Sequence, residues 1–342
     1  MQAQRPGDIL IADSDERLLS SATSALAQVG HMVMTCKTGA EARRQLERMP
    51  YDVVLCGWQL PDESGTSFCD YVKRNPELIH VTFGLLIDAQ ASDMWVAKIF
   101  LGSGDDTLAT PDDLIMRSTS AQELCVRVQS LLQLRRYRQE ITNALDTLML
   151  TAEGIEEQDR RASGHCKRLS IMTVELGAVL GCDEWQITAL ERASYLHDIG
   201  KVAIPGAIIA KTERLSPREM EIVQSHCVLG ERLCLNMAAL RPVLPIIRHH
   251  HERLNGTGYP DKLKGEEIPI LAQIFSIPDI YDALRMWRPY RRPMNEAQAT
   301  GILRQEVGQG FWNQQIFEAF LAHVLPGLEA RLDSSHALWP AT

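Results

Sequence analysis

Residues 249 to 260 combine side chains that bind transition metals with a loop broken by glycines. Three consecutive histidines, His249, His250 and His251, open the stretch, and Tyr259 and Pro260 close it. Neutral imidazole is the commonest protein ligand for transition metals. The two glycines between these ends allow the backbone to turn and to approach a ligand closely. A polar surface loop after a helix is the simpler alternative for this stretch taken alone.

Further candidate ligands in the chain favour a metal site over a surface loop. They lie at the ends or on the faces of expected helices: His165, His197, Asp198, His226 and Asp279. Any one of these histidines could be an ordinary helix-face histidine. Together they form the mixed imidazole and carboxylate set that suits iron or manganese, with zinc, nickel and cobalt less favoured by the share of oxygen ligands.

Five ordered blocks of the sequence resemble the HD-GYP phosphodiesterases, a branch of the HD metal-dependent phosphohydrolases. The blocks are YLHDIGK at 195–201, His226 with Gly230, HHERLNGTGYP at 250–260, Asp279 with Asp282, and RPYR at 288–291. The resemblance covers residues 150 to 325, and five blocks in one order are more specific than a single His-Asp pair. Members of that family degrade cyclic di-GMP, which the resemblance implies as the substrate here.

The resemblance also implies roles for individual positions. Metal ligands are implied at His165, His197, Asp198, His226, His250, His251 and Asp279. Contacts with the dinucleotide are implied for Lys201, Gly258, Tyr259, Pro260, Arg288 and Arg291. Asp198 and Lys201 are the expected catalytic residues, Asp198 as a bridge between two metals and Lys201 as a point charge for a phosphate oxygen.

Two divalent metal ions, Fe or Mn, are the expected cofactors. A pair about 3.5–4 Å apart can hold a bridging hydroxide and neutralise charge on the entering and leaving oxygens of a phosphodiester. Some family members hold a third metal through a glutamate one helical turn before the first histidine. Arg161 occupies that position, and Glu156 and Glu157 are expected to be poorly placed. We therefore predict two metals and linear pGpG as main product, with slow conversion to GMP.

Neighbouring positions have less direct roles in this interpretation. Asn255 and Gln273 stand where the family usually has aspartate and arginine, which changes loop geometry and affinity but removes no ligand. Asp282 shares a helix face with Asp279, so we expect it to be a hydrogen-bond partner of a histidine. His249 is expected beside the ligands or at the surface.

Residues 1–118 predict a doubly wound α/β domain of the flavodoxin-like type. Apolar runs at 9–12, 32–34, 53–56 and 83–87 alternate with helical patterns at 18–29 and 40–48. This order, with DVVLCGWQLP at 52–61 and GDD at 104–106, resembles the receiver domain of response regulators.

The positions that carry phosphorylation chemistry in a receiver are altered here. Gly57 stands at the acceptor aspartate, and glycine offers no nucleophile. The acidic pair for Mg²⁺ is reduced to Asp13 beside Ser14, the hydroxyl position falls on Asp88, and the lysine position on Thr110 before a proline. This degenerate receiver-like domain is expected to mediate dimerisation or partner binding.

Residues 119–153 predict one amphipathic linker helix, and residues 154–335 an all-α HD-GYP phosphohydrolase domain. Apolar positions in the linker recur at three- and four-residue spacing over more than 25 residues. A helix of this length could form a parallel coiled coil in a homodimer, or it could pack on its own domain.

The composition limits the classes of binding partner that we expect. A net charge of −9 argues against general nucleic-acid binding. The sequence has no apolar signal core and no run long enough to span a membrane, and its eight cysteines contain no Cys-x-x-Cys pair. A cytoplasmic protein without a membrane partner is expected. A GGDEF-type or other signalling protein is an expected partner.

Three functions are compatible with these residues. The leading one is a metal-dependent cyclic di-GMP phosphodiesterase in bacterial second-messenger signalling. The second is a catalytically weak cyclic-dinucleotide sensor or adaptor that signals through protein contacts. The third is an HD phosphohydrolase for another nucleotide, such as a mixed-base cyclic dinucleotide.

Overall fold

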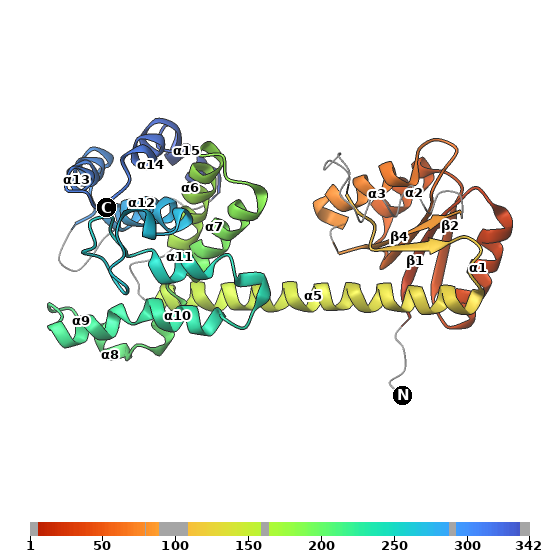
Figure 1. Ribbon diagram of the computed structural model, residues 1–342, viewed down its shortest axis with the longest axis horizontal. Coiled ribbons are helices and arrows are strands. Elements are labelled where there is room, and N and C mark those ends of the chain that lie inside the picture. The colour runs from red at the N-terminus through yellow and green to blue at the C-terminus, as the bar shows by residue number, and fades with distance from the viewer. Residues whose placement is uncertain (1–5, 79, 89–108, 159–163, 287–291, 336–342) are drawn as a thin grey trace. The chain divides into compact units, whose positions relative to one another are not determined.

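The computed structural model describes residues 6–78, 80–88, 109–158, 164–286 and 292–335. The chain forms two compact units, Met1–Ala144 and Leu145–Thr342. The division falls within helix α5 (Ala121–Gln158), which continues five residues beyond the predicted end of the linker at 153. Figure 1 labels the elements of both units.

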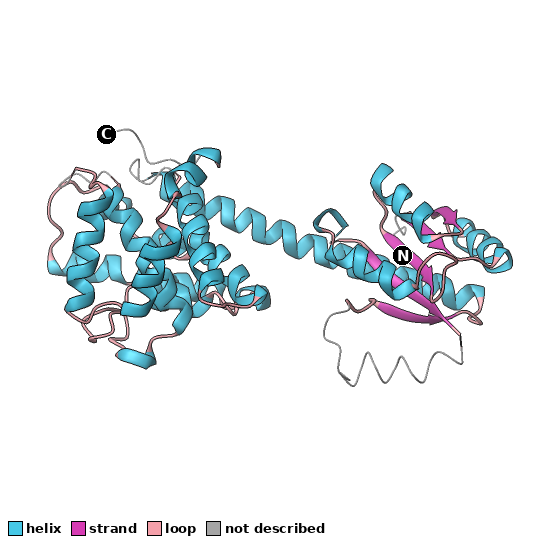
Figure 2. Ribbon diagram, turned by 90° about the horizontal axis from the view of Figure 1, so that it is seen from above, coloured by secondary structure: helices cyan, strands magenta, loops and turns pink. Residues whose placement is uncertain are grey.

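The first unit is built on one parallel sheet with the strand order β2-β1-β3-β4-β5. This confirms the predicted doubly wound α/β fold, and Figure 2 shows its strands in magenta. The structure adds a fifth strand that the sequence analysis did not predict. The elements are β1 (Asp8–Ala12), α1 (Glu16–Gln28), β2 (Met32–Cys36), α2 (Gly39–Arg48), β3 (Val53–Gly57), α3 (Gly65–Arg74), the 3₁₀ turn η1 (Pro76–Leu78), β4 (Thr82–Ile87) and β5 (Asp113–Met116).

Burial explains why these segments form strands. Every residue of β3 and β4 is buried, as expected for central strands of a parallel sheet that is covered on both faces. Side chains alternate between two apolar clusters, so that Leu10 and Val54 face one layer while Ile9 and Val53 face the other. The first turns of α5 complete the second layer through Val128 and its apolar neighbours.

The second unit consists of helices joined by loops, and its described residues form no β-strand. Its α-helices are α6 (His165–Val179), α7 (Glu184–Leu196), α8 (Gly206–Ile209), α9 (Pro217–Gln224), α10 (His226–Cys234), α11 (Leu244–His249), α12 (Ile270–Arg285), α13 (Glu296–Gly308), α14 (Gln314–Ala319) and α15 (Leu328–Ser334). Short helical turns complete it: η2 (Ile199–Ala203), η3 (Ala238–Leu240), η4 (Gly265–Glu267) and η5 (Phe320–Val324).

One apolar core holds these helices together. It joins the end of α5 to α6, α7, α11, α12 and the C-terminal helices through Leu145, Leu169, Leu190, Ile247 and Phe275, among other buried side chains. Among the described residues, no helix is both long and apolar enough to cross a membrane.

Two glycines allow η2 to lie directly against α10. A Cβ atom at Gly200 would collide with the carbonyl oxygen of His226 and would approach the backbone nitrogen of Gly230 at 2.6 Å. Because η2 follows Asp198 and α10 begins at His226, this close approach brings those two residues together.

Gly200→Ala should therefore destabilise the helical unit by about 1–3 kcal/mol, the usual cost of overpacking a filled site. Gly301→Ala is the matched control, since Gly301 is exposed inside α13 and an added Cβ meets nothing within 4 Å. The control should stay level or gain up to about 1 kcal/mol from helix propensity. Chemical denaturation of both variants measures the difference. Equal stabilities would contradict the packing argument.

Candidate metal centre

The predicted ligands within the described residues come together at the ends of several helices. His165 starts α6, His197 and Asp198 follow α7, His226 starts α10, His250 and His251 follow α11, and Asp279 lies inside α12. Residues at helix ends can direct their side chains to a common point, because the chain changes direction there. All of the predicted ligands except His251, which is half-buried, are buried.

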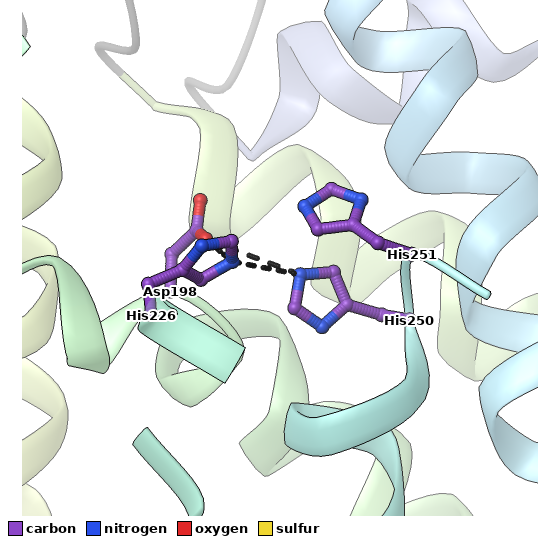
Figure 3. Close-up of side chains that lie close together, drawn as sticks. All are labelled: Asp198, His226, His250 and His251. Carbon is purple, nitrogen blue, oxygen red and sulfur yellow. Dashed lines mark hydrogen bonds and ion pairs between the residues drawn. The ribbon is translucent and has the colours of Figure 1, made fainter. Parts of the chain in front are cut away.

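The first group of donors consists of Asp198, His226, His250 and His251. One ligand atom from each lies within 4.8 Å of the others. The Oδ1 atom of Asp198 is 3.0 Å from Nε2 of His226 and 3.9 Å from Nε2 of His250. Figure 3 shows Asp198 and His226 side by side, with the two consecutive histidines coming from the segment after α11.

The second group consists of Glu156, His165 and His197. Oε1 of Glu156 is 3.8 Å from Nε2 of His165 and 3.9 Å from Nε2 of His197. Oδ1 of Asp279 approaches the same two nitrogens, at 3.6 Å and 4.0 Å. His197 also lies 3.3 Å from Oδ2 of Asp198, so the two groups are neighbours.

The expectation that Glu156 is poorly placed was wrong. It rested on counting helical turns back from His165, but α5 ends at Gln158 and α6 begins at His165 as a separate helix. Spacing along one helix therefore does not relate the two residues. Glu156 reaches the histidines from the end of α5 and is buried there. Arg161, the other residue in that argument, lies outside the described residues.

Backbone carbonyls orient two of the imidazoles. Nδ1 of His226 donates to the carbonyl oxygen of Val223 at 2.7 Å, and Nδ1 of His250 donates to that of Ile247 at 2.9 Å. In each ring Nδ1 therefore carries a proton, and Nε2 is the nitrogen that is directed toward the other donors. The two Nε2 atoms lie 3.5 Å apart and face the Asp198 carboxylate. Ligand histidines are commonly fixed in this way.

A buried carboxylate fixes His165. Its Nδ1 lies 2.7 Å from Oδ2 of Asp282, and Arg168 donates to both oxygens of the same carboxylate at 2.7 and 3.1 Å. The predicted role of Asp282 as a hydrogen-bond partner of a histidine is confirmed. Arg168 and Asp282 are fully buried, so the pair holds His165 rigidly with Nε2 directed at Glu156 and Asp279.

The surroundings raise the pKa of some of these histidines and lower the pKa of others. Burial lowers the pKa of His165, but the carboxylates of Glu156 and Asp282 outweigh burial and raise it to about 9. Against the same effect of burial, Asp198 raises the pKa of His226 to about 10. Burial lowers the pKa of His251 to about 3 and that of His250 well below its usual value. A cation that binds here would replace protons on the first two rings.

The glycine loop is fixed beside the first group. The Glu252 carboxylate accepts hydrogen bonds from the backbone nitrogens of residues 261, 262 and 263 at 2.7, 2.9 and 3.2 Å. A Cβ atom at Gly258 would approach the carbonyl oxygen of His251 at 2.6 Å, so this position needs glycine. The ring of Tyr259 consequently lies 4.8 Å from that of His251.

The remaining predicted residues have different positions. Lys201 donates to Oδ2 of Asp198 rather than pointing freely into solvent. His249 lies apart from both groups, 3.5 Å from Oδ2 of Asp261. Asn255 accepts from the nitrogen and hydroxyl of Thr257 at 3.0 and 2.7 Å, which closes the turn of the glycine loop. Arg288 and Arg291 lie outside the described residues.

In the first unit, an arginine fills the pocket where a receiver binds Mg²⁺. Arg117 donates to both oxygens of Asp13 at 2.7 and 3.0 Å and lies 3.6 Å from Asp15 and 3.5 Å from Asp88. A Cβ atom at Gly57 would collide with Asp13 and lie 3.4 Å from Nη1 of Arg117. The pocket therefore already contains a cation of its own.

The assignment of the receiver's lysine position to Thr110 was wrong. The final strand is Asp113–Met116, and the residue that follows it and points into the acidic pocket is Arg117. Pro111 indicated Thr110 because the lysine of a receiver precedes a proline, but Pro111 comes before this strand and not after it.

Comparison with protein families identifies the helical unit. The sequence model of the HD domain matches residues 144–314, half of the chain. The chain belongs to the HD domain family. The response regulator receiver domain matches residues 9–98, in agreement with the parallel sheet of the first unit.

Some curated relatives match most of this chain, and others match about half of it. The cyclic di-GMP phosphodiesterase response regulator RpfG of Xanthomonas campestris is 28% identical over 76% of this chain and 72% of its own length. A cyclic di-GMP phosphodiesterase of Thermotoga maritima is 28% identical over 92% of this chain and 89% of its own length. A 3′3′-cGAMP-specific phosphodiesterase of Vibrio cholerae is 34% identical over 50% of this chain and 33% of its own length.

The residues present fit the divalent metals that the HD domain family implies. Oδ1 of Asp198 is buried and lies 3.0 Å from Nε2 of His226 and 3.9 Å from Nε2 of His250, with one nitrogen of His251 in the same group. A buried carboxylate oxygen that faces several imidazole nitrogens is the donor set of a divalent transition metal. A metal at this position would take the place of the proton that His226 shares with Asp198.

The receiver pocket predicts that beryllofluoride or acetyl phosphate with Mg²⁺ leaves hydrolysis and oligomeric state unchanged. Gly57 offers no acceptor, and Arg117 already pairs with Asp13. Turnover and light scattering with and without the phosphate analogue test this, with an intact receiver treated in parallel as the positive control. A response abolished by Asp52→Asn or Asp62→Asn would contradict it and assign acceptance to that carboxylate.

Proposed function

We propose that this protein is a metal-dependent phosphodiesterase that hydrolyses cyclic di-GMP to linear pGpG. The observation that carries the proposal is the pair of adjacent donor groups, which meet where His197 and Asp198 follow each other in the chain. Support for the substrate comes from the relatives in Xanthomonas campestris and Thermotoga maritima, which are named cyclic di-GMP phosphodiesterases and match most of this chain.

The two groups would hold one divalent ion each, Fe or Mn by the mixture of nitrogen and oxygen donors. His226, His250 and His251 would ligate one ion, and Glu156, His165, His197 and Asp279 the other, with Asp198 between them. When bound, such a pair supplies an activated water at neutral pH and neutralises charge on the phosphate. Glu156 is an addition to the ligand set that the sequence predicted.

The remaining residues would bind and orient the dinucleotide. Lys201 is partly exposed and pairs with Asp198, so its ammonium group would lie beside the scissile phosphate of a bound dinucleotide. Gly258, Tyr259 and Pro260 form the fixed loop next to His251, where the tyrosine ring can contact a base. Arg288 and Arg291 remain the proposed partners of the second phosphate, through guanidinium hydrogen bonds.

A homodimer through α5 also belongs to this proposal. Large apolar side chains on this helix are exposed in the single chain, among them Tyr137, Ile141 and Leu150 at 61%, 52% and 68%. Such side chains are typical of a helix that packs against a second copy.

A mixed-base cyclic dinucleotide is the second candidate substrate. It is favoured by the similarity, 34% identity over half of this chain, to the 3′3′-cGAMP-specific enzyme of Vibrio cholerae. The chemistry proposed for the metal centre is the same for both substrates, so base recognition separates them.

Turnover on a substrate panel tests the function. Purified protein loaded with Mn²⁺ or Fe²⁺ under anaerobic conditions should convert cyclic di-GMP to pGpG. Chromatography of the reaction products measures this conversion. Asp198→Ala should lower turnover by at least about 100-fold and reduce bound metal, since it removes the proposed bridge and its charge. Asp333→Ala, an exposed aspartate of α15, is the matched control and should retain both.

Three outcomes would contradict the proposal. Faster hydrolysis of 3′3′-cGAMP than of cyclic di-GMP would favour the second candidate. Tight binding of cyclic di-GMP with no turnover by metal-loaded protein would favour a sensor or adaptor. Normal metal content and turnover in Asp198→Ala would remove the two-metal assignment.

A further inference from the structure

The Cys166 thiol donates a hydrogen bond to the Glu156 carboxylate. Sγ of Cys166 lies 2.8 Å from Oε2 of Glu156, and both side chains are buried, with exposed fractions of 2% and 6%. The opposite oxygen, Oε1, is the one that faces Nε2 of His165 and Nε2 of His197. One oxygen of this carboxylate therefore contacts the thiol while the other contacts the donor group.

This contact matters because Glu156 has few other constraints. It lies near the C-terminal end of α5, two residues before the helix ends, and a glutamate side chain has several rotatable bonds. In the part of the chain that the structure describes, the thiol is its one hydrogen-bond donor. Cys166 itself is well fixed, because it lies in the first turn of α6 between His165 and the buried Arg168.

We propose that Cys166 is a positioning residue that orients Glu156 as a ligand of the second metal. This inference rests on the proposed function and deepens it. The thiol holds Oε2 away from the centre, so that Oε1 is presented to the cation together with His165 and His197. A partner that orients a ligating carboxylate commonly changes metal affinity by about 10- to 100-fold.

The thiol remains a donor rather than a ligand. Sγ lies 2.8 Å from Oε2 of Glu156, and an ionised carboxylate oxygen can only accept, so the sulfur carries its proton in this contact. A protonated thiol is a weak donor and a poor metal ligand, since the thiolate is the form that binds metals. Sulfur ligation would also favour softer metals than the iron or manganese proposed here.

Mn²⁺ titration of four proteins tests the proposal: wild type, Cys166→Ala, Cys166→Ser and Glu156→Gln. Cys166→Ala should weaken the second Mn²⁺ equivalent about tenfold, the low end expected for a weak donor. Cys166→Ser keeps a donor of similar size and should stay within about threefold of wild type. Cys234→Ala, which removes a buried thiol elsewhere in the same unit, is the matched control and should leave Mn²⁺ binding unchanged.

A double variant shows whether the thiol acts through the carboxylate. The double variant Cys166→Ala with Glu156→Gln should bind Mn²⁺ as weakly as Glu156→Gln alone. Once the carboxylate is gone, the thiol has no ligand to orient, so its loss should have no further effect. Additive losses would overturn the proposal. So would unchanged binding in Cys166→Ala, or a sulfur-to-metal charge-transfer band in the near ultraviolet when Co²⁺ replaces Mn²⁺.

The result for this residue is distinguishable from the result for the function. Two bound Mn²⁺ with the expected order of variants, but without hydrolysis of any cyclic dinucleotide, would support Cys166 and remove the phosphodiesterase. Hydrolysis of cyclic di-GMP together with Mn²⁺ binding that does not depend on Cys166 would support the phosphodiesterase and remove the role of Cys166. A wild type that binds fewer than two Mn²⁺ would overturn the role assigned to Cys166.

Discussion

The helical unit depends on the charge interactions that stabilise the buried carboxylate of Asp198. Burial alone would raise the pKa of this group, but Lys201, His197 and His226 outweigh burial and hold the pKa well below its usual value. A buried anion is stable only when opposite charges and hydrogen-bond donors surround it. The fold therefore has to bring the end of α7, η2 and the start of α10 to one point, and a bound cation would add to the same balance.

The packing around this point follows from that requirement. Gly200 and Gly230 let η2 and α10 approach closely, and the Glu252 carboxylate fixes the loop that carries Tyr259. On the other side, the Arg168–Asp282 pair holds His165. Each of these contacts positions a ligand or the loop beside the ligands, and the Cys166 thiol is proposed to position Glu156 in the same way.

Local patterns predicted much of this arrangement. Capping boxes at Asp183 and Ser216 start α7 and α9, and such a motif can be recognised in a sequence because it depends only on residues three positions apart. The spacing of the five blocks likewise identified the histidines that meet. Glu156 and Arg117 could not be found in this way. Glu156 reaches its partners across a break between two helices. Arg117 stands at the position of a receiver's lysine, after a strand that begins later in the sequence than the proline at 111 indicated.

The most direct test of the account is anomalous diffraction from crystals of the Mn²⁺-loaded protein. We expect two anomalous peaks per chain, about 3.5–4 Å apart, the usual separation in two-metal sites. One peak should lie among His226, His250 and His251, the other among Glu156, His165 and His197, with Asp198 contacting both. A single peak, or a second peak that leaves Glu156 uncoordinated, would contradict it.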